Sequence, residues 1–186
     1  DPNPKKINLG IGIYTTPEGN PFVFPSIQKA VNALDRNNFN YLSFQGHETF
    51  LEATARLYLG DNIDLDSIAM QQSCGGTHAC RLMGDLIARN HEDTETPTIY
   101  EGTPTWSNHF ALFDKLKIEK FNHLNEQEEV NFEAYKSVIK KANPQDAILI
   151  HGGQTHNPTG RNLTLDQIKS LTPLLKERSI FVFIDF

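Results

Sequence analysis

Residues 147–160 read Ala147-Ile148-Leu149-Ile150-His151-Gly152-Gly153-Gln154-Thr155-His156-Asn157-Pro158-Thr159-Gly160. The stretch begins with consecutive apolar residues and then turns polar. An apolar run without alternation is typical of a strand that is covered on both faces. Asn-Pro-Thr-Gly continues neither a strand nor a helix, so we expect a loop that holds the Asn157 amide at the carboxyl end of the strand. Open α/β sheets bind their ligands at that edge.

The remainder of the chain alternates between helix and strand periodicity. Capping-box spacings at Thr49 and Glu52 and at Thr164 and Gln167 predict helix starts, and Gly60 predicts a helix end. We expect helices over residues 26–36, 49–59, 78–89, 106–113, 132–142 and 164–177. We expect strands over residues 68–72, 98–100, 117–121, 146–151 and 180–185. This order predicts an α/β fold with a doubly wound, mostly parallel sheet and helices on both of its faces.

Composition and charge narrow the function classes. Hydrophobic residues make up 38% and charged residues 22% of the chain, which is typical of a soluble globular protein. A net charge of −6 argues against a general nucleic-acid or acidic-membrane binder and leaves a small anionic ligand open. No apolar run approaches the about 18 residues that a membrane span needs. Cys74 and Cys80 are interpreted as free thiols, which favours a reducing compartment, the cytoplasm.

The two ends of the chain differ from this pattern. Residues 1–25 are rich in Pro, Gly and Asn and predict an arm ahead of the main domain, residues 26–186. Residues 179–186 are a strongly apolar strand candidate, and domains seldom end inside such a strand. We therefore interpret the chain as a fragment of a longer polypeptide. The alternative is a short protein that uses this segment as its last central strand.

A glycine turn, Cys74-Gly75-Gly76-Thr77, lies between a predicted strand and a predicted helix. The backbone N–H groups of the first helical turn and the Thr77 hydroxyl can hold a phosphate there. The alternative is a plain tight turn with a helix cap. The motif is neither the G-x-G-x-x-G dinucleotide fingerprint nor a P-loop, which requires Gly-Lys-Ser/Thr.

Trp106 and Asp185 are further candidate site residues. Trp106 follows a predicted strand, where its indole can lie against a flat ligand ring; a core or interface tryptophan is the alternative. Asp185 stands between Ile184 and Phe186, and a carboxylate in apolar surroundings needs a cationic or hydrogen-bonding partner. The seven histidines show no metal-ligand spacing, so we expect no metal. A Ser/His/Asp hydrolase lacks support because no G-x-S-x-G elbow is present.

Taken together, these pieces resemble the aspartate and aromatic amino acid aminotransferases, fold-type I enzymes that use pyridoxal 5′-phosphate. The resemblance covers nearly the whole chain, and six landmarks occur in the family's order. They are Ile7-Asn8-Leu9-Gly10-Ile11-Gly12-Ile13-Tyr14, Asn40-Tyr41-Leu42, Gly75-Gly76-Thr77, Pro104-Thr105-Trp106-Ser107-Asn108-His109, His156-Asn157-Pro158-Thr159-Gly160 and Ile184-Asp185-Phe186. The resemblance implies that residues 26–186 are part of a large cofactor-binding domain, cut short at its C-terminal end. It also implies transfer of an amino group between an amino acid, aspartate or aromatic, and a 2-oxo acid.

The resemblance assigns three residues to the cofactor ring. Asp185 pairs with the pyridine nitrogen and keeps it protonated, so that the ring withdraws electrons when the substrate loses its Cα proton. Asn157 donates its amide to the phenolic oxygen of the ring. Trp106 stacks on the ring face and helps to fix the angle at which the substrate meets it. These roles make Asp185 and Trp106 the expected catalytic residues, and Trp106 and Asn157 also border the substrate.

Other roles implied by the resemblance concern the phosphate, the substrate and a second subunit. Gly76 and Thr77 grip the phosphate, with Gly75 beside them. The Gly12 backbone touches the substrate carboxylate. Tyr41 reaches the phosphate of the neighbouring subunit, so a homodimer is implied.

His109 occupies the position of a family histidine that lies behind the aspartate and helps to keep Asp185 ionised. An ordinary residue on a helix surface is the alternative. The chain also departs from the family's pattern. The Schiff-base lysine, which lies tens of residues beyond the aspartate, has no counterpart here, nor do the arginines that clamp the substrate. His78 and residues 42–45 differ from the residues most common in the family at these positions, which leaves the substrate preference open.

Two other functions fit the same residues. Related fold-type I enzymes use the same ring contacts for decarboxylation, β-elimination or cyclisation. A non-catalytic domain that binds a phosphorylated ligand through Gly75-Gly76-Thr77 is the other possibility, and it requires no lysine.

Overall fold

The computed structural model describes residues 2–3, 5–8, 10, 12–90, 96–152 and 155–186. Leu9 and Ile11 of the first landmark, and Gly153 and Gln154 of the stretch quoted at the outset, lie outside the described residues. The chain forms two compact units, Asp1–Ser43 and Phe44–Phe186. The candidate site belongs to the second unit.

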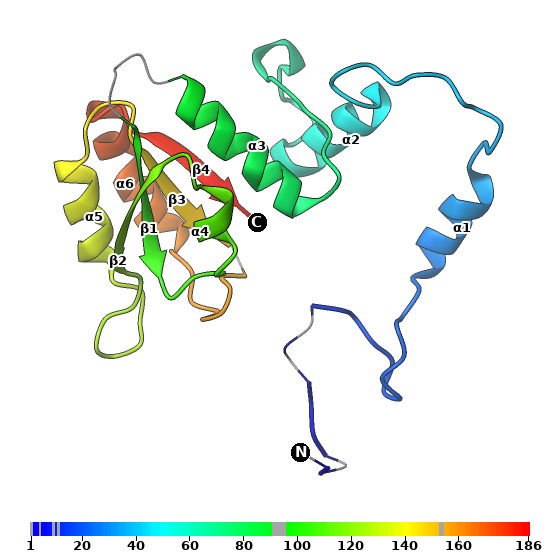
Figure 1. Cartoon of the computed structure of the whole chain (residues 1–186), viewed down its shortest axis with the longest axis horizontal. Helices are drawn as coiled ribbons and strands as arrows, with labels where there is room; N and C mark the ends of the chain where they lie inside the picture. The colour runs from blue at the N-terminus through cyan, green and yellow to red at the C-terminus, as the bar shows by residue number, and fades with distance from the viewer. Residues whose placement is uncertain (1, 4, 9, 11, 91–95, 153–154) are drawn as a thin grey trace. The chain divides into compact units, whose positions relative to one another are not determined.

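A four-stranded sheet organises the second unit. Its strands are β1 (Thr98–Thr103), β2 (Lys117–Asn122), β3 (Ala147–His151) and β4 (Phe181–Asp185). They lie in the order β2-β1-β3-β4, and every neighbouring pair is parallel (Figure 1). The chain adds β2 on one side of β1 and then β3 and β4 on the other. That reversal is the topological switch point at which doubly wound sheets bind ligands.

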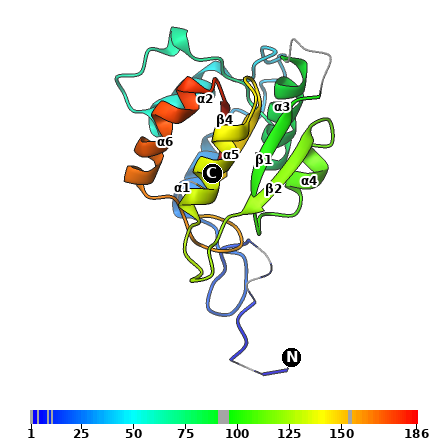
Figure 2. The same cartoon turned by 90° about the vertical axis from the view of Figure 1, so that its left-hand side faces the viewer.

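Helices cover both faces of this sheet, which confirms the doubly wound prediction. Helices α5 (Phe132–Lys141) and α6 (Leu165–Glu177) pack on one face, and α3 (Gly76–Arg89) and α4 (His109–Leu112) pack on the other (Figure 2). Because side chains alternate along a strand, β3 serves both layers. Ile148 and Ile150 join the core under α5 and α6, while Ala147 and Leu149 join the core under α3 and α4.

Of the two predicted capping boxes, the one at Thr164 is present and the one at Thr49 is not. Thr164 caps α6, and Gln167 completes a capping box, as predicted. The capping box predicted at Thr49 and Glu52 is wrong, because α2 (Glu48–Leu59) already begins at Glu48. Gly60 ends α2 with a φ of 90°, as predicted. None of the helices in the described part of the chain is long and apolar enough to cross a membrane.

The contacts at the start of α2 differ from those of the predicted capping box. The Gln72 side chain accepts the backbone N–H of His47, the residue at the N-cap of α2, at 2.8 Å. Glu52 pairs with Arg56 at 2.9 Å instead of reaching back to the helix start.

The strand predicted over residues 68–72 is also wrong. A 3₁₀ turn, η1 (Leu65–Ser67), precedes this segment, which then runs as irregular chain. A strand needs a ladder of backbone partners. In the described part of the chain this segment has a single such contact, from the Gln72 N–H to the Gln45 carbonyl, at 2.7 Å. The helix predicted over residues 106–113 is reduced to α4.

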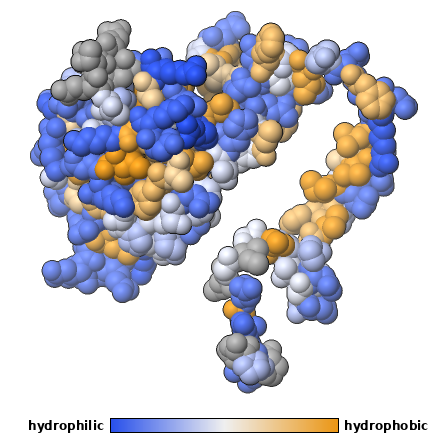
Figure 3. Space-filling model, in the orientation of Figure 1, coloured by the Kyte–Doolittle hydropathy of each residue, from blue (hydrophilic) through white to orange (hydrophobic). Residues whose placement is uncertain are grey.

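The first unit contains helix α1 (Pro25–Ala33) and the predicted arm of residues 1–25. The rings of Tyr14, Phe22 and Phe24 contact one another, with centroids 5.1 to 5.5 Å apart. All three side chains are exposed, and Figure 3 shows apolar side chains continuing along α1. Within this unit, apolar surface is therefore left uncovered.

Candidate active site at the carboxyl edge of the sheet

Three titratable side chains meet where the strands end. Asp185 is the last residue of β4 and stands opposite His151, the last residue of β3. The Asp185 Oδ2 atom lies 2.9 Å from His109 Nε2 and 3.8 Å from His151 Nε2. His109 is fully buried at the start of α4, whereas the Asp185 side chain keeps 23% of its surface exposed. Asp185 is therefore the member of this group that a ligand can reach.

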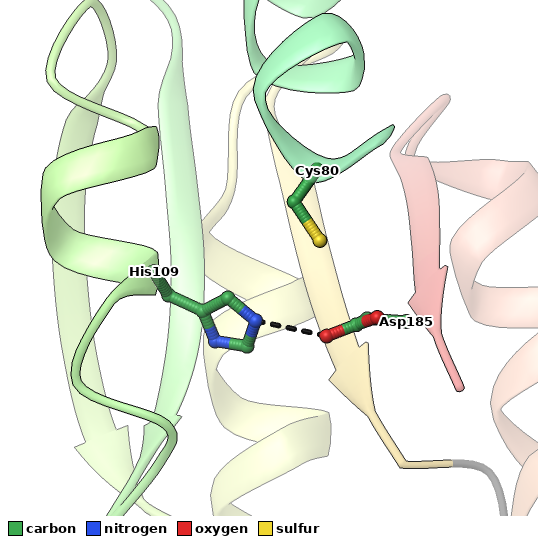
Figure 4. Close-up of side chains that lie close together, drawn as sticks. All are labelled: Cys80, His109 and Asp185. Carbon is green, nitrogen blue, oxygen red and sulfur yellow. Dashed lines mark hydrogen bonds and ion pairs between the residues drawn. The ribbon is translucent and has the colours of Figure 1, made fainter. Parts of the chain in front are cut away.

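Cys80 approaches the same point from α3. Figure 4 shows the side chains of Cys80, His109 and Asp185 directed toward one another from α3, α4 and β4. One polar atom from each lies within 4.8 Å of the others. The expectation of no metal stays a prediction.

The far side of His109 faces a second carboxylate. Glu101 on β1 is fully buried, and its Oε1 atom lies 2.8 Å from His109 Nδ1. Its other oxygen, Oε2, has no hydrogen-bond partner among the described residues. The Thr105 hydroxyl lies 3.2 Å from His109 Nδ1 and 3.3 Å from His151 Nδ1. Thr105 thus bridges the two imidazoles on the side away from Asp185.

These neighbours set the charges of the group. Burial opposes the charge of His109, but hydrogen bonds with Asp185, Cys80 and Glu101 outweigh it and raise the pKa of His109 to about 11. The hydrogen bond from His109 lowers the pKa of Asp185, against the effect of burial. Burial and the nearby His109 charge lower the pKa of His151. Asp185 therefore presents an ionised carboxylate, supported by a cation from behind.

The loop after β3 is anchored by His156. Its ring Nδ1 atom lies 2.9 Å from the Thr159 hydroxyl, and its backbone N–H donates to Asn162 Oδ1 at 2.9 Å. Asn157 follows directly and is exposed, and its peptide bond to Pro158 is cis. The loop thus presents the Asn157 side chain to solvent beside a buried histidine.

The N-terminus of α3 provides an anion site in the same unit. Gly75 occupies the N-cap with a φ of 137°, and no side chain caps the helix. Gly76 and Thr77 in its first turn are exposed. Uncapped N–H groups and the helix dipole favour a phosphate at such an end. Gly75, Gly76 and Phe186 line one cavity of about 600 Å³, which places the helix end beside the residue that follows Asp185.

The structure thus brings several predicted residues together. Trp106 is half-buried, and its ring meets the edge of His109 with the centroids 5.2 Å apart. Asp185, His109 and Trp106 form one cluster, and Gly75 and Gly76 border the adjoining cavity. Gly12 and Tyr41 belong to the first unit. The roles predicted for all these residues toward a ligand stay predictions.

Sequence reasoning did not assign a role in the site to Cys80, Glu101, Thr105 or His151. One signal was available for His151, which ends a predicted strand as Asp185 does, and neighbouring parallel strands end at the same edge. Glu101 had a weaker signal, a charged residue directly after an apolar strand. Cys80 lies one helical turn after Gly76, and nothing in the sequence placed it opposite Asp185.

Comparison with known proteins identifies the family. The model of "Aminotransferase class I and II" matches residues 4–186. The chain belongs to this family of aminotransferases. The mitochondrial aspartate aminotransferase of Dictyostelium discoideum is 34% identical over 194 residues, a match that covers 100% of this chain and 45% of that protein.

Solved aminotransferase structures share the fold. An aromatic amino acid aminotransferase with 3-indolebutyric acid superposes with a TM-score of 0.87 and 30% identity, covering 99% of this chain and 47% of that one. The aromatic-amino-acid aminotransferase of Burkholderia pseudomallei, covalently bound to pyridoxal phosphate, superposes with a TM-score of 0.84 and 25% identity. The match covers 99% of this chain and 47% of that one. This aminotransferase chain therefore spans about half the length of the relatives that it matches.

Proposed function

We propose that this chain supplies much of the cofactor site of an aminotransferase dependent on pyridoxal 5′-phosphate, which moves an amino group between an amino acid, aspartate or aromatic, and a 2-oxo acid. The observation that carries the proposal is the Asp185 carboxylate, held ionised by His109 at 2.9 Å and still reachable at the sheet edge. A pyridine nitrogen is protonated and bound by such a group. The names of the relatives support the reaction class.

The residues present fit this cofactor. The uncapped N-terminus of α3 suits a phosphate, and it borders the same cavity as Phe186, the neighbour of Asp185. An anionic carboxylate suits the ring nitrogen at the other end of the group. When bound, pyridoxal phosphate supplies an electron-withdrawing ring that stabilises the charge left as the substrate loses its Cα proton.

The residues of the proposed site then position the cofactor. Gly76 and Thr77, with Gly75 beside them, hold the phosphate through N–H groups and a hydroxyl. Asp185 holds the proton on the ring nitrogen. Trp106, whose own orientation is set by its edge contact with His109, covers one face of the ring and keeps water from it.

The exposed Asn157 completes the polar contacts. Its amide donates to the phenolic oxygen of the ring, from the loop that His156 anchors. Together with Asp185 and the phosphate grip, this contact fixes the ring at separate points, which sets its angle to the substrate. The lysine that the reaction requires has no counterpart in the chain.

The first unit contributes to the proposed assembly. We propose that the arm, residues 1–25, brings the Gly12 backbone to the substrate carboxylate. Tyr41 reaches the phosphate site of the partner subunit in a homodimer. The exposed ring cluster of Tyr14, Phe22 and Phe24 supports a further contact surface in this unit. The two free thiols, Cys74 and Cys80, support a cytoplasmic location.

The proposal is tested on the complete protein with pyridoxal phosphate. It is incubated with 2-oxoglutarate and, in separate reactions, aspartate, tyrosine or phenylalanine, and glutamate is measured. Glutamate formation with one of these donors is the expected result. Release of product without glutamate would identify a lyase, and the absence of both turnover and a borohydride-trapped cofactor would identify a non-catalytic binding domain.

A further inference from the structure

Both ring nitrogens of His109 face carboxylate oxygens. Asp185 Oδ2 lies 2.9 Å from Nε2, and Glu101 Oε1 lies 2.8 Å from Nδ1. His109 and Glu101 are both fully buried, so water does not screen these contacts. The three side chains come from α4, β1 and β4 and form a continuous series that ends at the reachable carboxylate.

The number of N–H donors that these two contacts require determines the charge of the imidazole. A neutral imidazole carries a single N–H, so it can donate to one of the two carboxylates only. At the other contact, a ring lone pair would face a carboxylate oxygen at hydrogen-bond distance, which is repulsive. An imidazolium donates to both carboxylates and removes the conflict.

Among the described residues, His109 is the hydrogen-bond and ion-pair partner of the Glu101 carboxylate. Its Oε2 atom lacks a partner among the described residues, and a buried carboxylate without compensation is costly. His109 is the only cation within an ion-pair distance of Glu101 in the described part of the chain. The carboxylate and the imidazolium therefore stabilise each other.

We propose that Glu101 is a positioning residue, which locks His109 as a cation that donates to both carboxylates and thereby holds Asp185 ionised toward the ring nitrogen of the cofactor. The part of this inference that concerns the ring nitrogen rests on the proposed function. The charge of His109 concerns the chain's own residues and can be measured without cofactor or substrate.

The other groups around His109 do not supply the same charge. Its other neighbours are Cys80 from α3, Thr105 and Trp106 from the segment before α4, the stacked ring of Phe113 after α4, and His151 from β3. A positive charge on His109 disfavours a second one on His151. Thr105 and Trp106 carry no charge, and Cys80 adds a hydrogen bond to His109. Beside Asp185, Glu101 is therefore the carboxylate that compensates the imidazolium. Without its charge, burial returns His109 toward the neutral ring.

The test compares the complete wild-type protein with its Glu101→Gln variant. Glutamine keeps the shape and loses the charge, so a merely space-filling role would not be affected. Glu119→Gln is the matched control, since Glu119 lies on the adjacent strand β2 and pairs with Lys141 at the surface. Protonation of the His109 ring nitrogens is followed by ¹⁵N–¹H NMR in the cofactor-free protein.

In the wild type and in Glu119→Gln, both nitrogens are expected to stay protonated from about pH 5 to about pH 9. In Glu101→Gln, one of the two nitrogens is expected to lose its proton within that range. The pH at which His109 loses this proton should thus fall by at least about 1 unit. Affinity for pyridoxal phosphate, read from quenching of Trp106 fluorescence, should gain a pH dependence in the same variant only. Glu101→Asp, which keeps the charge, should restore the wild-type pattern.

Two results would overturn the inference. One is a wild-type His109 with a single ring N–H at neutral pH, which decides the matter even where Glu101→Gln fails to fold. The other is a Glu101→Gln protein in which both nitrogens stay protonated. Because the NMR measurement uses no substrate, these results are separate from a failure of the transamination assay, which would overturn the proposed function instead.

Discussion

The imidazole rings of His123 and His156 lie parallel, with centroids 3.9 Å apart and an interplanar angle of 4°. His123 Nε2 lies 2.9 Å from the Arg161 carbonyl oxygen, so this nitrogen carries the proton and donates. His123 Nδ1 lies 2.9 Å from the Tyr135 hydroxyl and accepts from it. A neutral ring therefore satisfies both contacts, and two neutral rings can stack without repulsion.

This stack makes the fold sensitive to acid. Burial and the neighbouring histidines lower the pKa of His156 from 6.5 to about 4, and burial also lowers the pKa of His123. Between these pH values the unfolded chain binds more protons than the folded chain, so the free energy of unfolding rises with pH. We expect the free energy of unfolding to fall by roughly 2 kcal/mol as the pH falls from 6.5 to 4.

Urea unfolding of the complete protein at several pH values checks this. His156→Gln should flatten the dependence between pH 4 and 6.5, whereas His47→Gln, a change at an exposed histidine, should leave it intact. An equally steep dependence in His156→Gln would contradict the assignment.

Asp185→Asn should lower turnover by about a hundredfold or more, because the amide keeps the shape but cannot hold a proton on a pyridine nitrogen. Steady-state kinetics of the complete protein measures the loss. Asp166→Asn removes the same charge from an exposed site in the first turn of α6 and should leave turnover unchanged. Near-normal turnover of Asp185→Asn would remove Asp185 from the catalytic role.

Gly152→Ala should destabilise the protein more than Gly160→Ala does. Both glycines have a positive φ, 61° and 65°, so an alanine is strained at either position. Only at Gly152 would the added Cβ meet the backbone of His156; at Gly160 it would meet open space. Gly152 also donates its N–H to the Asp185 carbonyl, so the disturbance reaches the site.

Thermal unfolding of the two glycine variants separates these effects. We expect about 1–2 kcal/mol for the φ penalty in both variants and a further loss in Gly152→Ala alone. Equal losses would show that the loop moves away from the added methyl group at little cost.

Thr164→Ala should cost about 1 kcal/mol of stability, because it removes the side-chain oxygen that accepts the Gln167 N–H at the start of α6. Thr172→Ala is the control in the same helix. The Thr172 hydroxyl donates to the Ile168 carbonyl, which already serves the helix, so its loss should be nearly neutral. Chemical denaturation of both variants gives the difference directly.

Local patterns in the chain predicted much of the architecture. The apolar run at 147–151, the capping box at Thr164 and the stop at Gly60 depend on neighbours a few residues away, and the structure confirms them. The prediction at 68–72 failed because an apolar segment becomes a strand only when another strand offers it a backbone ladder. The Thr49 capping box failed because α2 begins one residue earlier, with His47 at its N-cap, and because the Glu52 carboxylate pairs with Arg56.

By itself, the sequence determined the alternation of strands and helices, the polar loop at Asn157 and the glycine turn before α3, since periodicity, turn chemistry and capping act over short stretches. Only the tertiary structure decided the strand order, which put Asp185 opposite His151. Local patterns did not predict the contact of Asp185 with His109, 76 residues away, which the family resemblance alone implied. The tertiary structure alone decided that Glu101 and Cys80 face the same imidazole. The physical reason is that charges in a site depend on burial and on partners in space, and a linear pattern specifies neither.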